Sequence, residues 1–140
     1  MNLQRDIVSQ HYRGIAFEEV FTRLLTEIGM RNYRVTRIDN IDNIHERREQ
    51  LGLQFDLRFQ HYKIVTFCNL DHCAQLISAE LLAGVFMPAR FVVFQQTGQD
   101  TVSIAFLKPT AFARLFHNAA LTHFATQLED DIHAILNEVE

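Results

Sequence analysis

Residues 62–90 place the strongest constraint on the fold, because they combine a strand, a sharp polar turn, a helix and a proline that leads into the next strand. Ile64, Val65 and Phe67 form a short apolar run of β-branched and aromatic residues, which is typical of a strand buried on both faces. Asn69 and Asp71 follow, and their short side chains favour a turn and a helix N-cap. We expect the helix to run from Cys73 through Leu81, with Gly84 as its stop.

Cys68 therefore lies where a strand passes into a helix N-terminus. The partial positive charge at that end favours a thiolate, which predicts a reactive thiol with a lowered pKa. The alternative is a small buried cysteine that only packs, which is a common role for a free thiol. The neighbouring candidates for a ligand or turn site are Asn69, Asp71, His72, Cys73 and Pro88.

The rest of the chain alternates between strand and helix patterns. We expect strands at residues 6–12, 33–38, 55–59, 90–96 and 101–107, with a hairpin turn at 97–100 in which Gly98 supplies a positive φ. We expect helices at residues 17–28, 41–51, 111–116 and 121–139, and glycines 29 and 52 end the first two. This order predicts a single α+β domain over residues 1–140.

Length and composition fit that prediction. The chain has 140 residues, of which 48% are hydrophobic and 21% charged, so it is long enough to bury a core. The net charge of −4 offers no basic field for nucleic acid, and no apolar run is long enough to span a membrane. With no secretion signal and only two cysteines, we expect a cytoplasmic protein whose cysteines are reduced.

Other chemistry has little support in the sequence. The spacings of His117, His123 and His133 do not return to one helix face, and the group of Cys68, His72 and Cys73 lacks a second ligand pair, so we expect no metal site. No serine lies in a GxSxG turn, and the five glycines form no phosphate-binding loop. We expect no cofactor.

Twelve phenylalanines without a tryptophan give the chain an aromatic interior. They either line a cavity for an apolar or flat ligand or simply fill the core between sheet and helices. The cavity hypothesis uses Phe91, Phe94, Phe106 and Phe124.

Several motifs together resemble a known family. The helix that contains FEEV at residues 17–20 ends at Gly29 and is followed by VTRID at residues 35–39. Residues 68–70 match a CNP turn after a buried strand, and residues 84–89 match a GLLPC segment that leads into a strand. In these respects the chain is similar to the family called domain of unknown function 302, and the resemblance covers about residues 6–116.

The resemblance implies an architecture like that of the TATA-box-binding protein, in which a curved antiparallel sheet carries helices on one face, often in a homodimer. It implies no established activity, and the helix at residues 121–139 looks like an addition. Leu70 replaces the proline of the turn, and Ala89 replaces the second cysteine of the family. Cys73 could substitute for that cysteine, being five residues from Cys68.

Three functions remain open from the sequence. The first is a non-enzymatic module that binds or senses a small ligand. The second is a thiol-dependent redox or sulfur-carrier protein that uses Cys68. The third is a homodimeric structural or interaction protein.

Overall fold

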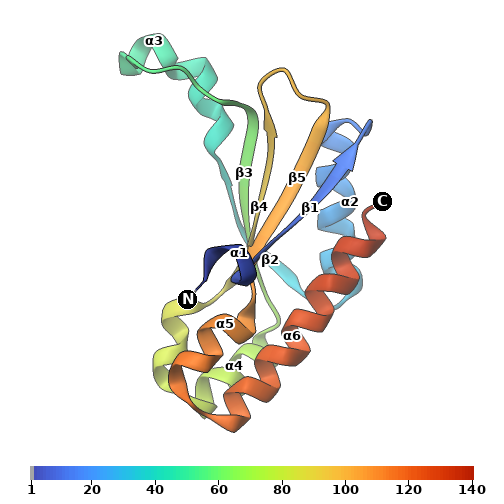
Figure 1. Cartoon of the computed structure of the whole chain (residues 1–140), viewed down its shortest axis with the longest axis vertical. Coiled ribbons are helices and arrows are strands. Elements are labelled where there is room, and N and C mark those ends of the chain that lie inside the picture. Colours follow the sequence, from blue (N-terminus) through green and yellow to red (C-terminus); the bar gives the residue numbers. More distant parts are fainter. Residues whose placement is uncertain (1) are drawn as a thin grey trace.

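The computed structural model describes residues 2–140, which form a five-stranded sheet with helices (Figure 1). The strands are β1 (Ile7–Arg13), β2 (Arg34–Asn40), β3 (Phe59–Cys68), β4 (Ala89–Gln96) and β5 (Thr101–Leu107). The α-helices are α1 (Leu3–Asp6), α2 (Phe17–Met30), α3 (Arg48–Leu51), α4 (Leu70–Ala79), α5 (Pro109–Ala113) and α6 (Ala119–Glu138). Three 3₁₀ helices complete the chain: η1 (Ile41–Arg47), η2 (Leu81–Phe86) and η3 (Arg114–Phe116).

The sheet has the order β1-β5-β4-β3-β2, and every neighbouring pair is antiparallel. β4 and β5 form the expected hairpin, whose turn contains Gly98 with a φ of +78°. The first two strands occupy opposite edges, so α2 connects them across the full width of the sheet (Figure 1). β2 is therefore an edge strand that pairs only with β3 on the sheet.

The core lies between one face of this sheet and the helices α2 and α6. Successive strand side chains point to opposite faces, so alternate positions enter the core. Val65 and Phe67 of β3 and Phe91 and Val93 of β4 are completely buried there. The buried residues of α6 follow the expected apolar stripe and are Leu121, Ala125, Leu128, Ile132, Ile135 and Leu136. The prediction of a single α+β domain with a long C-terminal helix is confirmed.

Two strand predictions need correction. β3 is not fully buried on both faces: Thr66 is buried on the face away from the helices, but Ile64 on the same face is only half-buried, because the helices of the core cover the opposite face. The expected separate strand at residues 55–59 is also wrong. Residues 55–58 are irregular, because pairing of β3 with β4 begins only at Phe59, opposite Gln96. They belong to a projection with η1 and α3 that extends from the end of the sheet (Figure 1).

Two helix stops also differ from the sequence prediction. Gly84 lies inside η2, and α4 already ends at Ala79, because the Glu80 side chain accepts a hydrogen bond from the Leu82 amide and starts η2. α2 continues through Gly29 to Met30, and the turn that follows places Asn32 at a φ of +64°. Asparagine is one of the few side chains that tolerate this left-handed conformation.

The four phenylalanines proposed to line one cavity are separated by the sheet. Phe91 and Phe106 pack edge to face in the core, with ring centroids 6.1 Å apart. Phe94 lies on the opposite face, since it is three residues from Phe91 on the same strand, and it stacks on Tyr62. Phe124 lines a space next to the cysteines, and Phe94 lines a separate hollow of about 300 Å³ together with Tyr62. The four residues therefore do not line one cavity.

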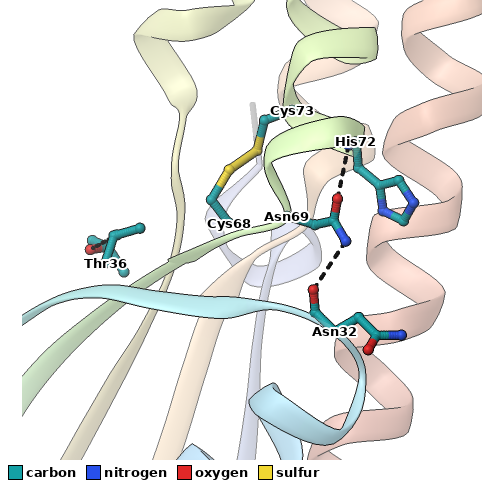
Figure 2. The surroundings of a disulfide bond; sticks show 7 residues. Asn32, Thr36, Cys68, Asn69, His72 and Cys73 are labelled. Carbon is teal, nitrogen blue, oxygen red and sulfur yellow. Dashed lines mark hydrogen bonds between the residues drawn. A yellow bond between two sulfur atoms is a disulfide. The ribbon is translucent and has the colours of Figure 1, made fainter.

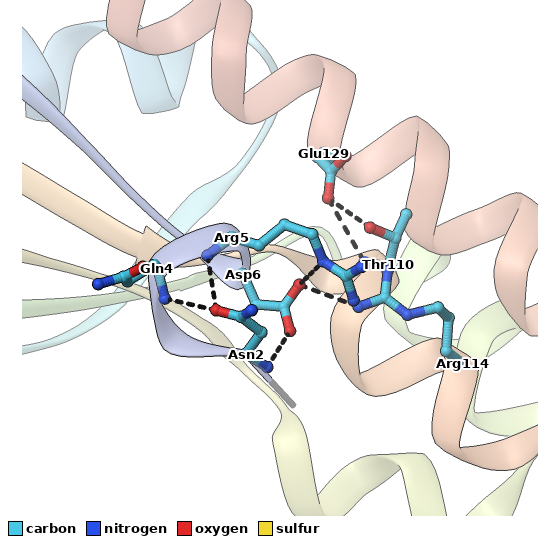
Figure 3. Close-up of polar contacts among 7 residues, drawn as sticks. All are labelled: Asn2, Gln4, Arg5, Asp6, Thr110, Arg114 and Glu129. Atoms are coloured by element: carbon cyan, nitrogen blue, oxygen red, sulfur yellow. Dashed lines mark hydrogen bonds and ion pairs between the residues drawn. The ribbon is translucent and has the colours of Figure 1, made fainter.

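Near the N-terminus, the carboxylate of Asp6 holds the first described residues against η3 (Figure 3). The Asp6 side chain is fully buried; it accepts hydrogen bonds from the Asn2 amide at 2.8 Å and from the Arg114 guanidinium at 2.9 Å. The Asn2 hydrogen bond is the main reason that the pKa of Asp6 falls from 3.8 to about 2, and Arg114 and Arg5 lower it further against the opposing effect of burial. Asp6 thus joins the start of the chain to η3.

The two faces of the sheet predict different costs for truncating Phe91 and Phe94. Phe91→Ala should lower the free energy of unfolding by about 3–5 kcal/mol, because it opens a cavity in the core. Phe94→Ala should lower it by about 1 kcal/mol, since it removes an aromatic pair on the uncovered face. Urea unfolding of both variants measures the two values, and equal losses would contradict the assignment of the faces.

The buried Asp6 carboxylate predicts a dependence of stability on acid pH. Its pKa is about 2 when folded and 3.8 in the reference state, so it stabilises the fold above pH 3.8, and this contribution is lost as pH falls towards 2. Thermal unfolding midpoints between pH 5 and pH 2 should therefore fall less steeply in Asp6→Asn, which should already be less stable at neutral pH. Asp56→Asn, at an exposed position, serves as the control. An unchanged slope in Asp6→Asn would refute the effect.

Candidate functional site

The two cysteines of the chain are joined in a disulfide between the end of β3 and the first turn of α4 (Figure 2). Cys68 is the last residue of β3, and Cys73 is the fourth residue of α4. The expectation that both cysteines are reduced is therefore wrong for this structure. With only two cysteines the chain can form no other pair, but whether they meet depends on where α4 begins, which sequence patterns alone do not determine.

Asn69 fixes the turn between the two cysteines, as its sequence position predicts. Its side-chain oxygen accepts a hydrogen bond from the His72 amide at 3.1 Å and caps α4. Its side-chain nitrogen donates to the Asn32 carbonyl oxygen at 3.0 Å (Figure 2). The N-terminus of α4 is thereby tied to the turn that follows α2, which holds the disulfide against the edge of the sheet.

The disulfide separates two spaces of different character. A small, partly open cavity of about 30 Å³ lies on one side, and both cysteines, His72 and Ala89 contribute to its wall. This volume holds a water molecule or two rather than a larger ligand. An open hollow of about 600 Å³ lies on the other side, where Cys68 but not Cys73 forms part of the wall. The full lining of the hollow is Asn32, Arg34, Val35, Thr36, Cys68, Asn69, Leu70 and Asp71.

A buried tyrosine and a carboxylate close the cavity on the side of α6. The Tyr33 hydroxyl donates a hydrogen bond of 2.7 Å to Asp131, and the ring packs edge to face on Phe67. Burial is the main reason that the pKa of Tyr33 is raised, and Asp131 raises it further. Tyr33 therefore stays protonated and continues to donate to Asp131 at neutral pH.

The structure brings most of the sequence candidates together. The small cavity is lined by Cys68, His72 and Cys73, and Asn69 caps the helix at the turn beside it. Asp71 lines the open hollow. Pro88 lies elsewhere: it lines a separate hollow of about 220 Å³ with Phe86, Pro109 and other residues.

Sequence reasoning missed three residues of the site: Arg34, Tyr33 and Asp131. In the sequence, Arg34 has the features of an ordinary exposed strand residue. Asp131 belongs to an acidic run that the helical pattern places on the solvent side of α6. No local signal identifies Tyr33 and Asp131 as a pair, because 98 residues separate them.

Other kinds of site find no support in the described part of the chain. Within residues 2–140, no group of three or more His, Cys, Asp or Glu side chains is arranged to hold a metal ion. None of the helices in this range is both long and apolar enough to cross a membrane.

Fold and site define an α+β protein whose disulfide links a central strand to the helix beside it. The model of the family described as "Domain of unknown function DUF302" matches residues 9–139, so the chain belongs to this family. The match runs through α6, which places that helix inside the family domain rather than beyond it.

A solved structure supports the fold. The chain is similar to the crystal structure of an uncharacterised conserved DUF302 protein from Bacillus stearothermophilus, with a TM-score of 0.81 and 24% sequence identity. The similarity covers 97% of this chain and 99% of that one. No curated protein matches the chain.

The contact between Tyr33 and Asp131 predicts an unequal effect of two tyrosine substitutions. Tyr33→Phe should lower the free energy of unfolding by about 1.5–3 kcal/mol, because it removes a hydrogen bond to a charged group. Tyr12→Phe removes a hydrogen bond to the neutral Leu136 carbonyl oxygen and should cost about 0.5–1.5 kcal/mol. Urea unfolding at pH 7 compares them, and a smaller loss for Tyr33→Phe than for Tyr12→Phe would contradict the contribution assigned to the contact with Asp131.

Proposed function

We propose that this protein is a thiol–disulfide redox protein whose reacting group is the Cys68–Cys73 disulfide. The observation that carries the proposal is the position of this disulfide: it joins a strand end to a helix N-terminus and borders an open hollow through Cys68. A disulfide that serves only to stabilise the fold needs no access for a second thiol. This one borders an open hollow of about 600 Å³ on one side and the small cavity of about 30 Å³ on the other.

The two sulfurs have different roles in the proposed exchange. Cys73 is only 9% exposed and lines the small cavity but not the open hollow, whereas Cys68 lines both, so an incoming thiolate meets Cys68 first. Cys73 lies in the first turn of α4, where the partial positive charge of the helix N-terminus favours a thiolate. A sulfur that is stabilised as a thiolate is also the better leaving group.

Atoms and electrons balance in the proposed thiol–disulfide exchange without a metal or cofactor. The incoming thiolate forms a bond to Cys68 Sγ, the Cys68–Cys73 bond breaks, and its electron pair leaves on Cys73 Sγ, which takes a proton from water. A second thiolate attacks the incoming sulfur of the mixed disulfide and releases Cys68 as a thiolate. Two substrate thiols are thereby oxidised to one disulfide, and the protein disulfide is reduced to two thiols by two electrons.

A purely ligand-binding role has less support than the sequence alone suggested. Of the phenylalanines chosen for a cavity, Phe91 and Phe106 fill the core and Phe94 lies on the other face of the sheet, and the space that Phe124 lines beside the disulfide is only about 30 Å³. The open hollow remains as a place for a small molecule, and it borders the reacting sulfur. Homodimer formation remains a prediction from the family resemblance.

The proposal predicts that the folded protein passes between two redox states. Incubation with graded ratios of reduced and oxidised dithiothreitol, followed by alkylation and intact-mass measurement, should show both cysteines becoming reduced in one two-electron transition. The circular dichroism spectrum should persist through that transition. Reduction that occurs only in urea would show that the disulfide serves the fold, and the proposal would then be rejected.

Single-cysteine variants test the assigned roles of the two sulfurs. Cys73→Ser leaves Cys68 beside the open hollow, and Cys68→Ser leaves Cys73 beside the small cavity. We expect Cys68 to be alkylated on the order of tenfold faster than Cys73, because Cys68 borders the open hollow whereas Cys73 is only 9% exposed. Equal rates in the two folded variants would contradict the assignment of Cys68 as the attacked sulfur.

A further inference from the structure

We propose that the thiol that exchanges with Cys68 is a small zwitterionic thiol, which carries one carboxylate and one ammonium group. Arg34 binds the carboxylate and Asp71 binds the ammonium. This inference rests on the proposed disulfide exchange and adds the chemical class of its co-substrate.

Arg34 stands directly beside the attacked sulfur. It is the register partner of Cys68 in the antiparallel pair of β2 and β3. Side chains of directly opposite residues point to the same face of a sheet, with Cβ atoms about 4.5–5.5 Å apart. Arg34 is exposed, and within residues 2–140 its guanidinium makes neither an ion pair nor a hydrogen bond. Its charge is therefore available to a ligand in the hollow.

Asp71 supplies the opposite charge on the wall of the same hollow. It is exposed in the first turn of α4, and its carboxylate accepts a hydrogen bond of 3.1 Å from the neutral amide of Gln75. Across residues 2–140 it forms no ion pair, with Arg34 or with any other cation. Two opposite charges thus line one hollow without neutralising each other, which suits a ligand that carries both.

Apart from the exposed side chain of Asn32, the remaining walls of the hollow leave recognition to these two charges. The Thr36 hydroxyl is hydrogen-bonded to Thr66 at 2.8 Å, and both ends of the Asn69 side-chain amide are occupied by backbone groups. Val35 and Leu70 contribute apolar surface. A volume of about 600 Å³ lies within the range of small-molecule sites, about 300–1,000 Å³, and accommodates an amino acid or a short peptide.

The chemistry is the exchange described above with a defined reactant. The thiolate of L-cysteine bonds to Cys68 Sγ, and the electron pair of the broken bond leaves on Cys73 Sγ, which takes a proton from water. The thiolate of a second L-cysteine then attacks the sulfur of the bound cysteine, so cystine leaves and Cys68 becomes a thiolate. Arg34 and Asp71 hold the first cysteine while its thiolate reaches the disulfide.

A series of four cysteine derivatives tests the two charges separately. L-cysteine carries both charges, N-acetylcysteine only the carboxylate, cysteine amide only the ammonium, and N-acetylcysteine amide neither. Rates of reduction of the folded protein, measured by alkylation and mass, are corrected for the pKa of each thiol. L-cysteine should then react about tenfold faster than N-acetylcysteine amide, a difference that corresponds to about 1.4 kcal/mol.

Variants at the two charges should remove this preference in a charge-specific way. In Arg34→Gln the carboxylate should no longer raise the rate, and in Asp71→Asn the ammonium should no longer do so. Arg13→Gln and Asp100→Asn change exposed charges that do not line the hollow and should keep the tenfold ratio. Each ratio is taken within one variant, so a general effect of Arg34 on the sulfur of Cys68 cancels.

The outcomes separate this inference from the proposed function. Equal corrected rates for the four derivatives in the unaltered protein, or a highest rate with N-acetylcysteine amide, which imitates a protein cysteine, would overturn the zwitterion proposal while disulfide exchange stands. Failure of dithiothreitol to reduce the folded protein would overturn both. Glutathione, which carries a second carboxylate, is a fifth probe: its corrected rate should be lower than that of L-cysteine, and an equal or higher rate would overturn the assignment of a thiol with a single carboxylate.

Discussion

The burial of Phe67 is the constraint on which the disulfide site depends. Its side chain is fully buried, stacked on Phe91 with ring centroids 4.8 Å apart, and it fixes which face of β3 enters the core. Because strand residues alternate between faces, the next residue, Cys68, points away from that core face and lies opposite Arg34. A shift of the register by one residue would bury the sulfur and separate it from the hollow. The position of this sulfur is therefore a consequence of core packing.

Local signals in the sequence were sufficient to predict most of the secondary structure. The alternation in β5, the glycine of the β4–β5 turn and the apolar stripe of α6 each act over a few residues, so their patterns persist in the folded chain. The capping role of Asn69 is equally local, since its partner is only three residues away. The strand prediction failed where a segment with strand-like alternation has no strand to pair with. Residues 55–58 alternate in this way, but the pairing of β3 with β4 begins only at Phe59.

The composition of the site could be predicted only in part, because its contacts depend on the tertiary arrangement. Cys68, Asn69 and His72 are neighbours in the sequence and were identified, but the bond to Cys73 depends on where α4 begins and how it is rotated. Tyr33 meets Asp131 only after α6 has packed on the sheet, and the same helix places Phe124 beside the cysteines. Arg34 could not be recognised as a residue of the site from the sequence, because its place opposite Cys68 depends on the register in which β2 and β3 pair.

The position of β1 determines the order in which the sheet can assemble. Its hydrogen-bond partner is β5, and the pairing of Ile7 with Leu107 closes a loop that contains most of the chain. Strands β2 to β5 are joined in sequence by antiparallel neighbours, whereas β1 has no partner until β5 has been made. During synthesis on the ribosome, the first strand must therefore wait unpaired while the other four are produced. Such long-range closure slows folding, so the completion of the sheet is a late event.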